Sequence, residues 1–241
     1  MAPVDDLQQE LSAIRLLAIQ YMLNAIEDAD MSAPDRAARS LTQAFADIIQ
    51  AFGEQAAMSA ARYLELDRQV AGVNLPSVVP ADTVPVEQIE RSLNWALRPL
   101  DAGDLRRAEQ QMAGSLQRLV EQPARETVWD ATVAAKTRYA RVPRGADPCP
   151  FCLMLASRGG VYSADSVITT TGRSTGSSGR PEGLAFHDNC HCVPMEIRQD
   201  DDVPGVTQQL QNLWAEHGGT LAGWTAYLKE NPFTPAGPNE V

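Results

Sequence analysis

The sequence predicts an α+β fold, with a mostly helical N-terminal region followed by a small α+β module and C-terminal helices. Residues 1–141 repeat apolar side chains at helical spacing and show no strand pattern. From Pro143 the composition changes to Gly, Pro, Ser and Thr, with short β-compatible pieces. Two amphipathic stretches then follow the acidic run at 199–202. We therefore expect three parts: residues 1–141, residues 142–230 and an extended tail, 231–241.

The N-terminal region begins with two expected helices. The first runs from about Asp5 to Asp30, and its apolar residues are spaced so that they share one face. The residues of this stripe are Leu7, Leu11, Ile14, Ala18, Met22 and Ile26. A stop and restart follows, in which Ser32 is the expected N-cap and Pro34 lies in the first turn of an alanine-rich helix. We expect that second helix to continue toward Asp67.

A connector and further helices complete this region. Residues 73–85 contain three prolines and are expected to be irregular. Helical spacing then returns, and Asp101 or Asp104 is the expected cap of a helix that continues to about Arg141. Pro123 lies inside that stretch and is expected to kink or restart the helix. These helices are expected to pack as a bundle or to leave part of their stripes for a partner helix.

The module carries three β-compatible pieces, with the sequences GGVYS, DSVITT and HCVPMEI. Residues 169–183 show no hydrophobic pattern and are expected to form a flexible loop. Two amphipathic helices are expected to close the chain, one around Leu210 and Trp214 and one around Leu221 and Trp224.

Composition and charge exclude several classes of protein. With 44% hydrophobic and 21% charged residues, the chain has the composition of a soluble globular protein, and no run approaches the ~20 apolar residues that span a bilayer. The net charge of −11 disfavours general nucleic-acid binding. The start of the chain lacks the features of a secretory signal, so we expect folding in a reducing cytoplasm. Residues 136–198 are mildly basic, with eight basic and five acidic side chains.

All four cysteines lie in two short motifs of the module. Cys149 and Cys152 form a C-x-x-C in DPCPFC, and FHDNCHC contains His187, Cys190 and Cys192 as H-x-x-C-x-C. Thiolates and imidazole in two such turns are the ligands that a tetrahedral structural zinc ion prefers. The spacing therefore predicts one Zn²⁺ per chain, which stabilises a segment with few large apolar residues.

The candidates exceed the four positions of a zinc site. We prefer Cys149, Cys152, His187 and Cys190, with Cys192 as the nearest competitor. If Cys192 enters a strand, His191 points to the opposite face and is expected at the surface or behind the ligands.

Three other interpretations of the cysteines stay open. A thioredoxin-like redox pair would need a βαβ setting, and structural disulfides fit poorly with a cytoplasmic chain. Plain buried cysteines are the third.

A catalytic zinc would need an open position and a base such as Asp188 or Glu196. No deaminase, serine-hydrolase or phosphate-loop motif is present, so we expect no enzymatic activity and no catalytic residues.

Residues 139–197 resemble the Mu F-like minor head protein family of tailed phages, particularly the version found in phages and prophages of actinobacteria. In that family an arginine-rich helix end leads into a C-P-x-C turn and a small-residue segment such as LASRG, and a histidine–cysteine motif then precedes a strand. The matching residues are Cys149, Cys152, Phe186, His187, Cys190 and Cys192. The resemblance extends over about residues 139–230, including the aromatic helices near the end.

The resemblance implies a minor capsid component that acts inside the head near the portal, during assembly or DNA delivery. The implied partners are the portal protein, the major capsid protein or both, and self-association is also considered. No specific nucleic acid and no membrane are expected as partners. The implied location is the virion interior, and the host cytoplasm during assembly. The alternatives are a zinc-dependent hydrolase, either nuclease or peptidase, and a host-directed effector carried in the head.

Overall fold

The computed structural model describes residues 3–30, 32–144, 148–160, 188 and 190–234, and it confirms the α+β fold. In chain order its elements are α1 (Pro3–Glu27), α2 (Pro34–Val70), α3 (Val86–Leu97), η1 (Arg98–Ala102), α4 (Leu105–Ala135), β1 (Arg138–Val142), α5 (Pro150–Ala156), β2 (Val193–Ile197), η3 (Asp200–Asp202), α6 (Gly205–His217) and α7 (Leu221–Glu230). None of the described helices is long and apolar enough to cross a membrane.

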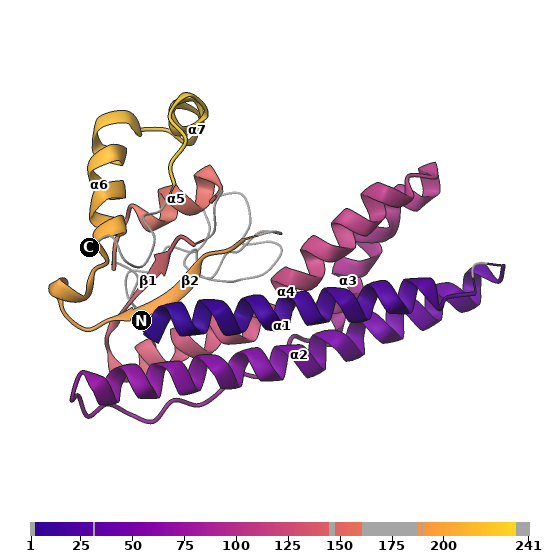
Figure 1. Ribbon diagram of the computed structural model, residues 1–241, viewed down its shortest axis with the longest axis horizontal. Helices are drawn as coiled ribbons and strands as arrows, with labels where there is room; N and C mark the ends of the chain where they lie inside the picture. Colours follow the sequence, from indigo (N-terminus) through magenta and orange to yellow (C-terminus); the bar gives the residue numbers. More distant parts are fainter. Residues whose placement is uncertain (1–2, 31, 145–147, 161–187, 189, 235–241) are drawn as a thin grey trace.

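The helical region consists of two arms that diverge from a shared base (Figure 1). α1 and α2 lie side by side along the long axis, and α4 packs against both of them at the base. The N-terminal half of α4 pairs with α3 in a second arm that leaves the first at an angle. Phe45, Ile49 and Leu116 are fully buried between the helices.

The predicted extents of the first two helices lie within a few residues of α1 and α2, and the irregular connector between α2 and α3 is confirmed. Asp104 is the N-cap of α4, and its carboxylate accepts a hydrogen bond from the backbone N–H of Arg107 at 3.0 Å. The expected cap at Ser32 is wrong, because Ala33 occupies the N-cap of α2 without a side-chain bond. The Ser32 hydroxyl instead donates to the carboxylate of Asp30, which holds the turn before the helix.

α4 passes through Pro123 as one helix, without a restart. The proline packs against α2 at Gly53, where an added Cβ would lie 3.3 Å from the Pro123 ring. The absent side chain at Gly53 lets the two helices approach closely at this point. Close packing against α2 therefore keeps α4 in place across a residue that removes a backbone hydrogen bond.

The end of α4 differs from the prediction. The helix was expected to continue to about Arg141, but it ends at Ala135, where Lys136 adopts a left-handed conformation with φ 56°. β1 begins two residues later and pairs antiparallel with β2 in a two-stranded sheet, with Ala140 opposite Met195. The helical pattern misled because residues around Tyr139 are buried against both the helices and the second strand.

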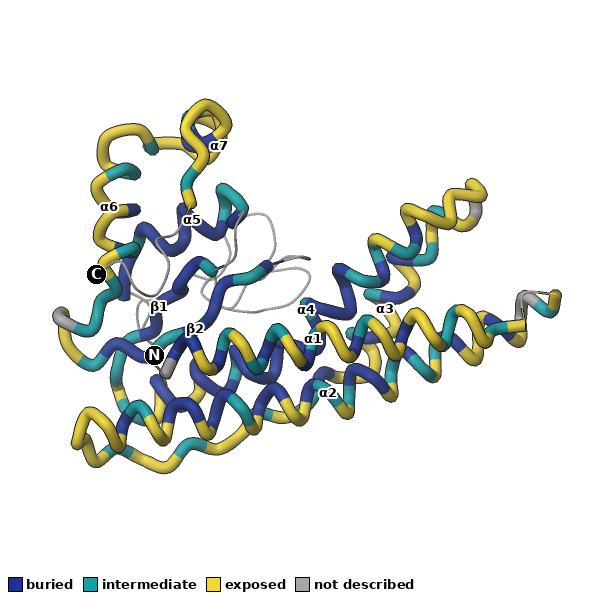
Figure 2. The backbone as a smooth tube through the Cα atoms, viewed as in Figure 1, coloured by how far each residue is buried: buried dark blue, intermediate teal, exposed yellow. Residues whose placement is uncertain are grey.

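One hydrophobic cluster extends from the helical region into the module (Figure 2). It includes Leu7 of α1, Val193 of β2 and Trp224 of α7, all of which are buried. The predicted boundary at residue 141 lies within β1, and most of the predicted tail, 235–241, lies outside the described residues. The module therefore packs onto the shared base of the helices, and the two parts bury a continuous core.

Candidate metal centre

Three cysteine thiols meet in the interior of the module. Cys152 comes from α5, and Cys190 and Cys192 come from the segment that enters β2. Their sulfur atoms all lie within 4.8 Å of one another, and the Sγ atoms of Cys152 and Cys190 are 3.2 Å apart. The three residues are only 1–3% exposed. We call these three residues the cysteine cluster.

The C-x-x-C motif is held by the start of α5. Cys149 is the N-cap of this helix, and its Sγ accepts a hydrogen bond from the backbone N–H of Cys152 at 3.2 Å. Pro150 occupies the first helical turn, where no backbone donor is needed, and its carbonyl accepts a bond from the indole of Trp224 at 3.0 Å. Cys149 itself is partly buried and packs against the cysteine cluster.

The segment before β2 is fixed by side chains of α4. The carbonyl of Cys190 accepts hydrogen bonds from the amide of Gln117 at 3.0 Å and from the guanidinium of Arg125 at 3.1 Å. Both donors are buried. These bonds place Cys190 and Cys192 by contact with the helical region, so their position depends on more than the local turn.

A buried arginine lies beside the thiols. The guanidinium Nη2 of Arg141, on β1, is 3.7 Å from Cys190 Sγ and 3.9 Å from Cys152 Sγ, and the residue is fully buried. Burial lowers the pKa of Arg141, but the negative charges of Cys190, Cys192 and Cys152 outweigh this effect and raise it. The structure thus places a positive charge beside thiols that carry negative charge when they lose a proton.

The thiols differ in their tendency to lose a proton. The hydrogen bond from Cys152 has the largest effect on the pKa of Cys190, followed by the one from Cys192, and together they lower it well below its usual range. The positive charges of the nearby Arg125 and Arg141 also lower this pKa. Hydrogen bonding to Cys149 and to Cys190 raises the pKa of Cys152. The cluster therefore favours at least one thiolate, which is the form that binds metal ions.

A second group of buried charges links the cluster to α1 and α4. Glu121 pairs with Arg125 and, at 3.4 Å, with Arg15. Burial raises the pKa of Glu121 to about 7, against the opposing effect of these arginines. Arg15 also donates to the Nδ1 atom of His191 at 2.8 Å, a geometry that requires an unprotonated Nδ1. His191 therefore contacts α1, while its two cysteine neighbours join the cluster.

The carboxylates that a catalytic zinc would need are engaged in other contacts. Asp188 accepts a bond from Arg118 at 2.7 Å. Glu196 is fully buried and receives two bonds from Arg68, at 2.8 and 2.9 Å, and one from the hydroxyl of Thr137 at 2.6 Å. This pair joins the end of α2 to β2, so Glu196 connects the helical region with the module.

The donor set suits zinc. In a tetrahedral site with Zn–S bonds of about 2.3 Å, sulfur atoms lie about 3.8 Å apart, which small rotations of the clustered side chains can reach. Cys152, Cys190 and Cys192 can hold a metal ion, with Cys149 or His187 as the fourth ligand. His187 lies outside the described residues. A zinc ion there would crosslink α5 to the start of β2.

Sequence reasoning missed the groups that support the cluster. Arg125 and Gln117 lie on α4 and carry no motif, and only their contact with Cys190 reveals them. Arg141 stands eight residues before Cys149, but an arginine in a short strand gives no sign of its burial. The redox interpretation required a βαβ setting, whereas the strands here are antiparallel. The C-x-x-C does begin a helix, as such a pair would.

Comparison with known protein families identifies the family to which the chain belongs. The family model described as "VG15 protein" matches residues 1–217, a stretch that contains the helical region, both cysteine motifs and α6. No curated protein and no solved structure matches the chain. Because the matched stretch covers most of the 241 residues, the chain belongs to the VG15 family, a phage-type protein family.

Proposed function

We propose that this phage-type protein is a minor capsid, head-morphogenesis protein of a tailed phage or prophage. It acts inside the head near the portal, in assembly or DNA delivery, and binds the portal protein, the major capsid protein or both. A structural zinc ion holds its module, and the chain has no catalytic role. The observation that carries this proposal is the buried cysteine cluster fixed onto a long helical region, within one phage-type family match.

The burial of the cluster supports a structural role for the metal. A hydrolytic zinc needs an open position for water and a base beside it. Here the three thiols are 1–3% exposed, and Arg141 lies against two of them. Glu196 is committed to Arg68, which favours stabilisation of the fold over hydrolysis.

The helical region supports a role in assembly. α1 and α2 extend away from the module as a long hairpin, and α1 exposes large apolar side chains along it (Figures 1 and 2). These include Leu16, Leu17 and Tyr21, which are each more than half exposed. Apolar residues on an otherwise acidic, elongated surface are typical of a protein that contacts other proteins.

Metal analysis tests the zinc claim. Protein purified without chelator is expected to contain about one zinc ion per chain, and Cys190→Ser is expected to lose the metal together with the stability of the module. Leu228→Ala is the matched control, because it removes buried apolar volume in α7 and leaves every sulfur in place. Metal-free wild-type protein with an unchanged melting curve after chelation contradicts the claim.

Particle composition tests the head role. When the chain is expressed during infection by the phage that encodes it, purified particles are expected to contain it, and disruption of its gene is expected to reduce filled heads. Co-expression with the portal protein is expected to give a complex that survives size-exclusion chromatography. Absence of the chain from purified particles contradicts the head role and leaves the zinc result unaffected.

A further inference from the structure

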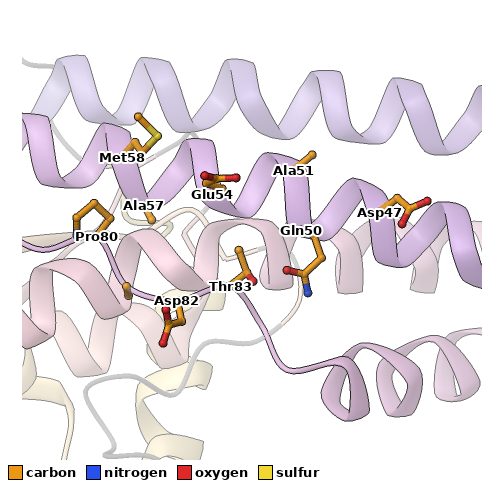
Figure 3. Close-up of a pocket in the computed structure, with 10 residues that line it drawn as sticks. Asp47, Gln50, Ala51, Glu54, Ala57, Met58, Pro80, Asp82 and Thr83 are labelled. Atoms are coloured by element: carbon orange, nitrogen blue, oxygen red, sulfur yellow. The ribbon is translucent and has the colours of Figure 1, made fainter.

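A groove runs along α2 beside the connector that precedes α3. Its volume is about 800 Å³, and Figure 3 shows the lining side chains of α2 next to the irregular segment at residues 80–83, with Gln50 pointing toward that segment. We call it the acidic groove, and its principal lining residues are Asp47, Ala51, Glu54, Met58, Pro80 and Asp82.

The acidic groove is lined by carboxylates and by apolar side chains. Asp47 and Glu54 are seven residues apart on α2, which places them about 10 Å apart along the helix. Asp82 lies on the opposite wall. Among the described residues, no basic side chain forms an ion pair with Glu54 or Asp82, and Met58 is 57% exposed. The groove therefore suits a partner surface that carries both positive charges and apolar side chains.

The tip of the second arm has the complementary character. It consists of the end of α3, η1 and the start of α4, and we call it the arm tip. Its exposed side chains are Trp95, Arg98, Leu100, Leu105, Arg106 and Arg107. Residues 91–107 contain four arginines and two aspartates, a net charge of +2 in a chain of −11. A hollow of about 310 Å³ is lined by Trp95, Arg98 and Arg107 among others.

The arm tip cannot reach the groove of its own chain. The connector that forms one wall of the groove leads directly into α3, and the arm tip lies at the far end of that helix. The 12 residues of α3 place these two points about 18 Å apart along a rigid element. Contact between the two surfaces therefore requires a second molecule.

We infer that this protein self-associates head to tail, with the arm tip of one copy docked in the acidic groove of the next. Arg98 and Arg107 face the carboxylates of the groove, and Trp95 or Leu105 covers the exposed apolar side chain of Met58. Because the two surfaces differ, the interface is heterologous, and repetition gives a ring or an open chain. This inference deepens the assembly role proposed above but does not depend on the metal.

Analytical ultracentrifugation of the full chain tests the inference. At about 0.1 M salt the weight-average mass is expected to rise with concentration above the 26.1 kDa of one chain. At about 1 M salt, where charges are screened beyond about 3 Å, it is expected to fall back toward that value. A wild-type chain that stays monomeric up to several hundred micromolar overturns the inference.

Charge reversal makes the test specific to the two surfaces. Arg98→Glu with Arg107→Glu in the arm tip, or Asp47→Lys with Glu54→Lys in the groove, is expected to weaken self-association at least tenfold. A mixture of the two double variants is expected to form a mixed complex with 1:1 stoichiometry, because the intact tip of one variant meets the intact groove of the other, and the reversed tip and reversed groove are also opposite in charge. Absence of that complex, or association that survives both reversals, overturns the inference.

Control variants separate the interface from general charge and from misfolding. Glu27→Lys with Asp28→Lys changes two exposed carboxylates at the end of α1, outside both surfaces, and is expected to leave self-association within twofold of wild type. Circular dichroism and zinc content are measured for every variant, so that loss of the fold is recognised. If the wild-type chain is monomeric but is still found in phage particles, this inference fails while the head role stands.

Discussion

The helical region and the module are stabilised in different ways. The helices bury long apolar stripes, so their stability is spread over residues such as Phe45, Ile49 and Leu116. The module has two five-residue strands and short helices, and its interior contains charged and sulfur groups such as Arg141 and Glu196. Loss of one apolar side chain leaves its neighbours in contact with one another, whereas removal of one partner of a buried charge pair leaves the other charge unpaired. The stability of the module is therefore concentrated in a few residues.

Removal of the metal should give the largest difference between the two regions. Zinc binding in small domains supplies folding free energy of the order of 10 kcal/mol, so a chelator is expected to reduce amide-exchange protection strongly in β1, β2 and α5. The central parts of α2 and α4 are expected to keep most of their protection, because their packing does not involve the thiols. Equal loss of protection in both regions contradicts the proposed difference between them. Addition of zinc is expected to restore the protection of the module.

The next largest effect is expected at the ion pair that joins the two regions. Arg68→Ala leaves Glu196 charged and fully buried without its partner, which costs about 3–5 kcal/mol of unfolding free energy. The matched control is Arg62→Ala on the same helix, where the exposed pair with Glu10 contributes less than about 1 kcal/mol. Urea denaturation of both variants provides the measurement. A similarly small loss of unfolding free energy in both variants contradicts the view that the stability of the module is concentrated in a few residues.

This contrast also explains how much the sequence revealed. The extents of α1 and α2, the connector and the cap at Asp104 were predictable because each depends on residues within a few positions of one another. The β1 strand was missed because its partner begins more than fifty residues later, and five residues do not establish a pattern. α5 was likewise missed, since seven residues beginning at a C-x-x-C motif were interpreted as a turn.

The cysteine motifs were recognisable because all four cysteines gather in two short segments, whereas their surroundings were not. Gln117, Arg125 and Arg141 come from α4 and β1, and their roles depend on tertiary contacts with Cys190. The Arg68 and Glu196 pair is separated by 128 positions in the chain. No periodicity encodes such a contact, so the sequence indicated the candidate ligands but not the charged residues around them.

Glu121 predicts a pH-dependent difference at the edge of the cluster. Its pKa is raised to about 7 in the folded chain, so between about pH 4.5 and 7 the folded state holds a proton that the unfolded state releases. The stability that this group contributes is fully present below pH 4.5 and is lost as pH rises through 7, by at most about 3 kcal/mol. Arg15 and Arg125 face this carboxylate, and Cys190 and His191 lie nearby.

Glu121→Gln tests this dependence. At saturating zinc, the unfolding free energy of wild type is expected to fall relative to the variant as pH rises from 5 to 8, because only wild type releases this buried proton. Glu10→Gln, at an exposed ion pair on α1, is the control and should leave the wild-type slope unchanged. A constant difference between wild type and Glu121→Gln across this range contradicts the raised pKa.

The smallest effect is expected when a helix N-cap hydrogen bond is removed, and this bond occurs in both regions. Asp104 caps α4 and Thr220 caps α7, each through a side-chain bond to a backbone N–H at 3.0 and 3.1 Å. Asp104→Ala and Thr220→Ala are each expected to cost about 1 kcal/mol locally. α4 is packed along most of its 31 residues, so its loss of exchange protection should be confined to the first turn. α7 has 10 residues and only Trp224 and Leu228 buried, so the loss should extend along the whole helix. If Asp104→Ala loses exchange protection as far as Val128, the stability of the helical region depends on single residues as much as that of the module does.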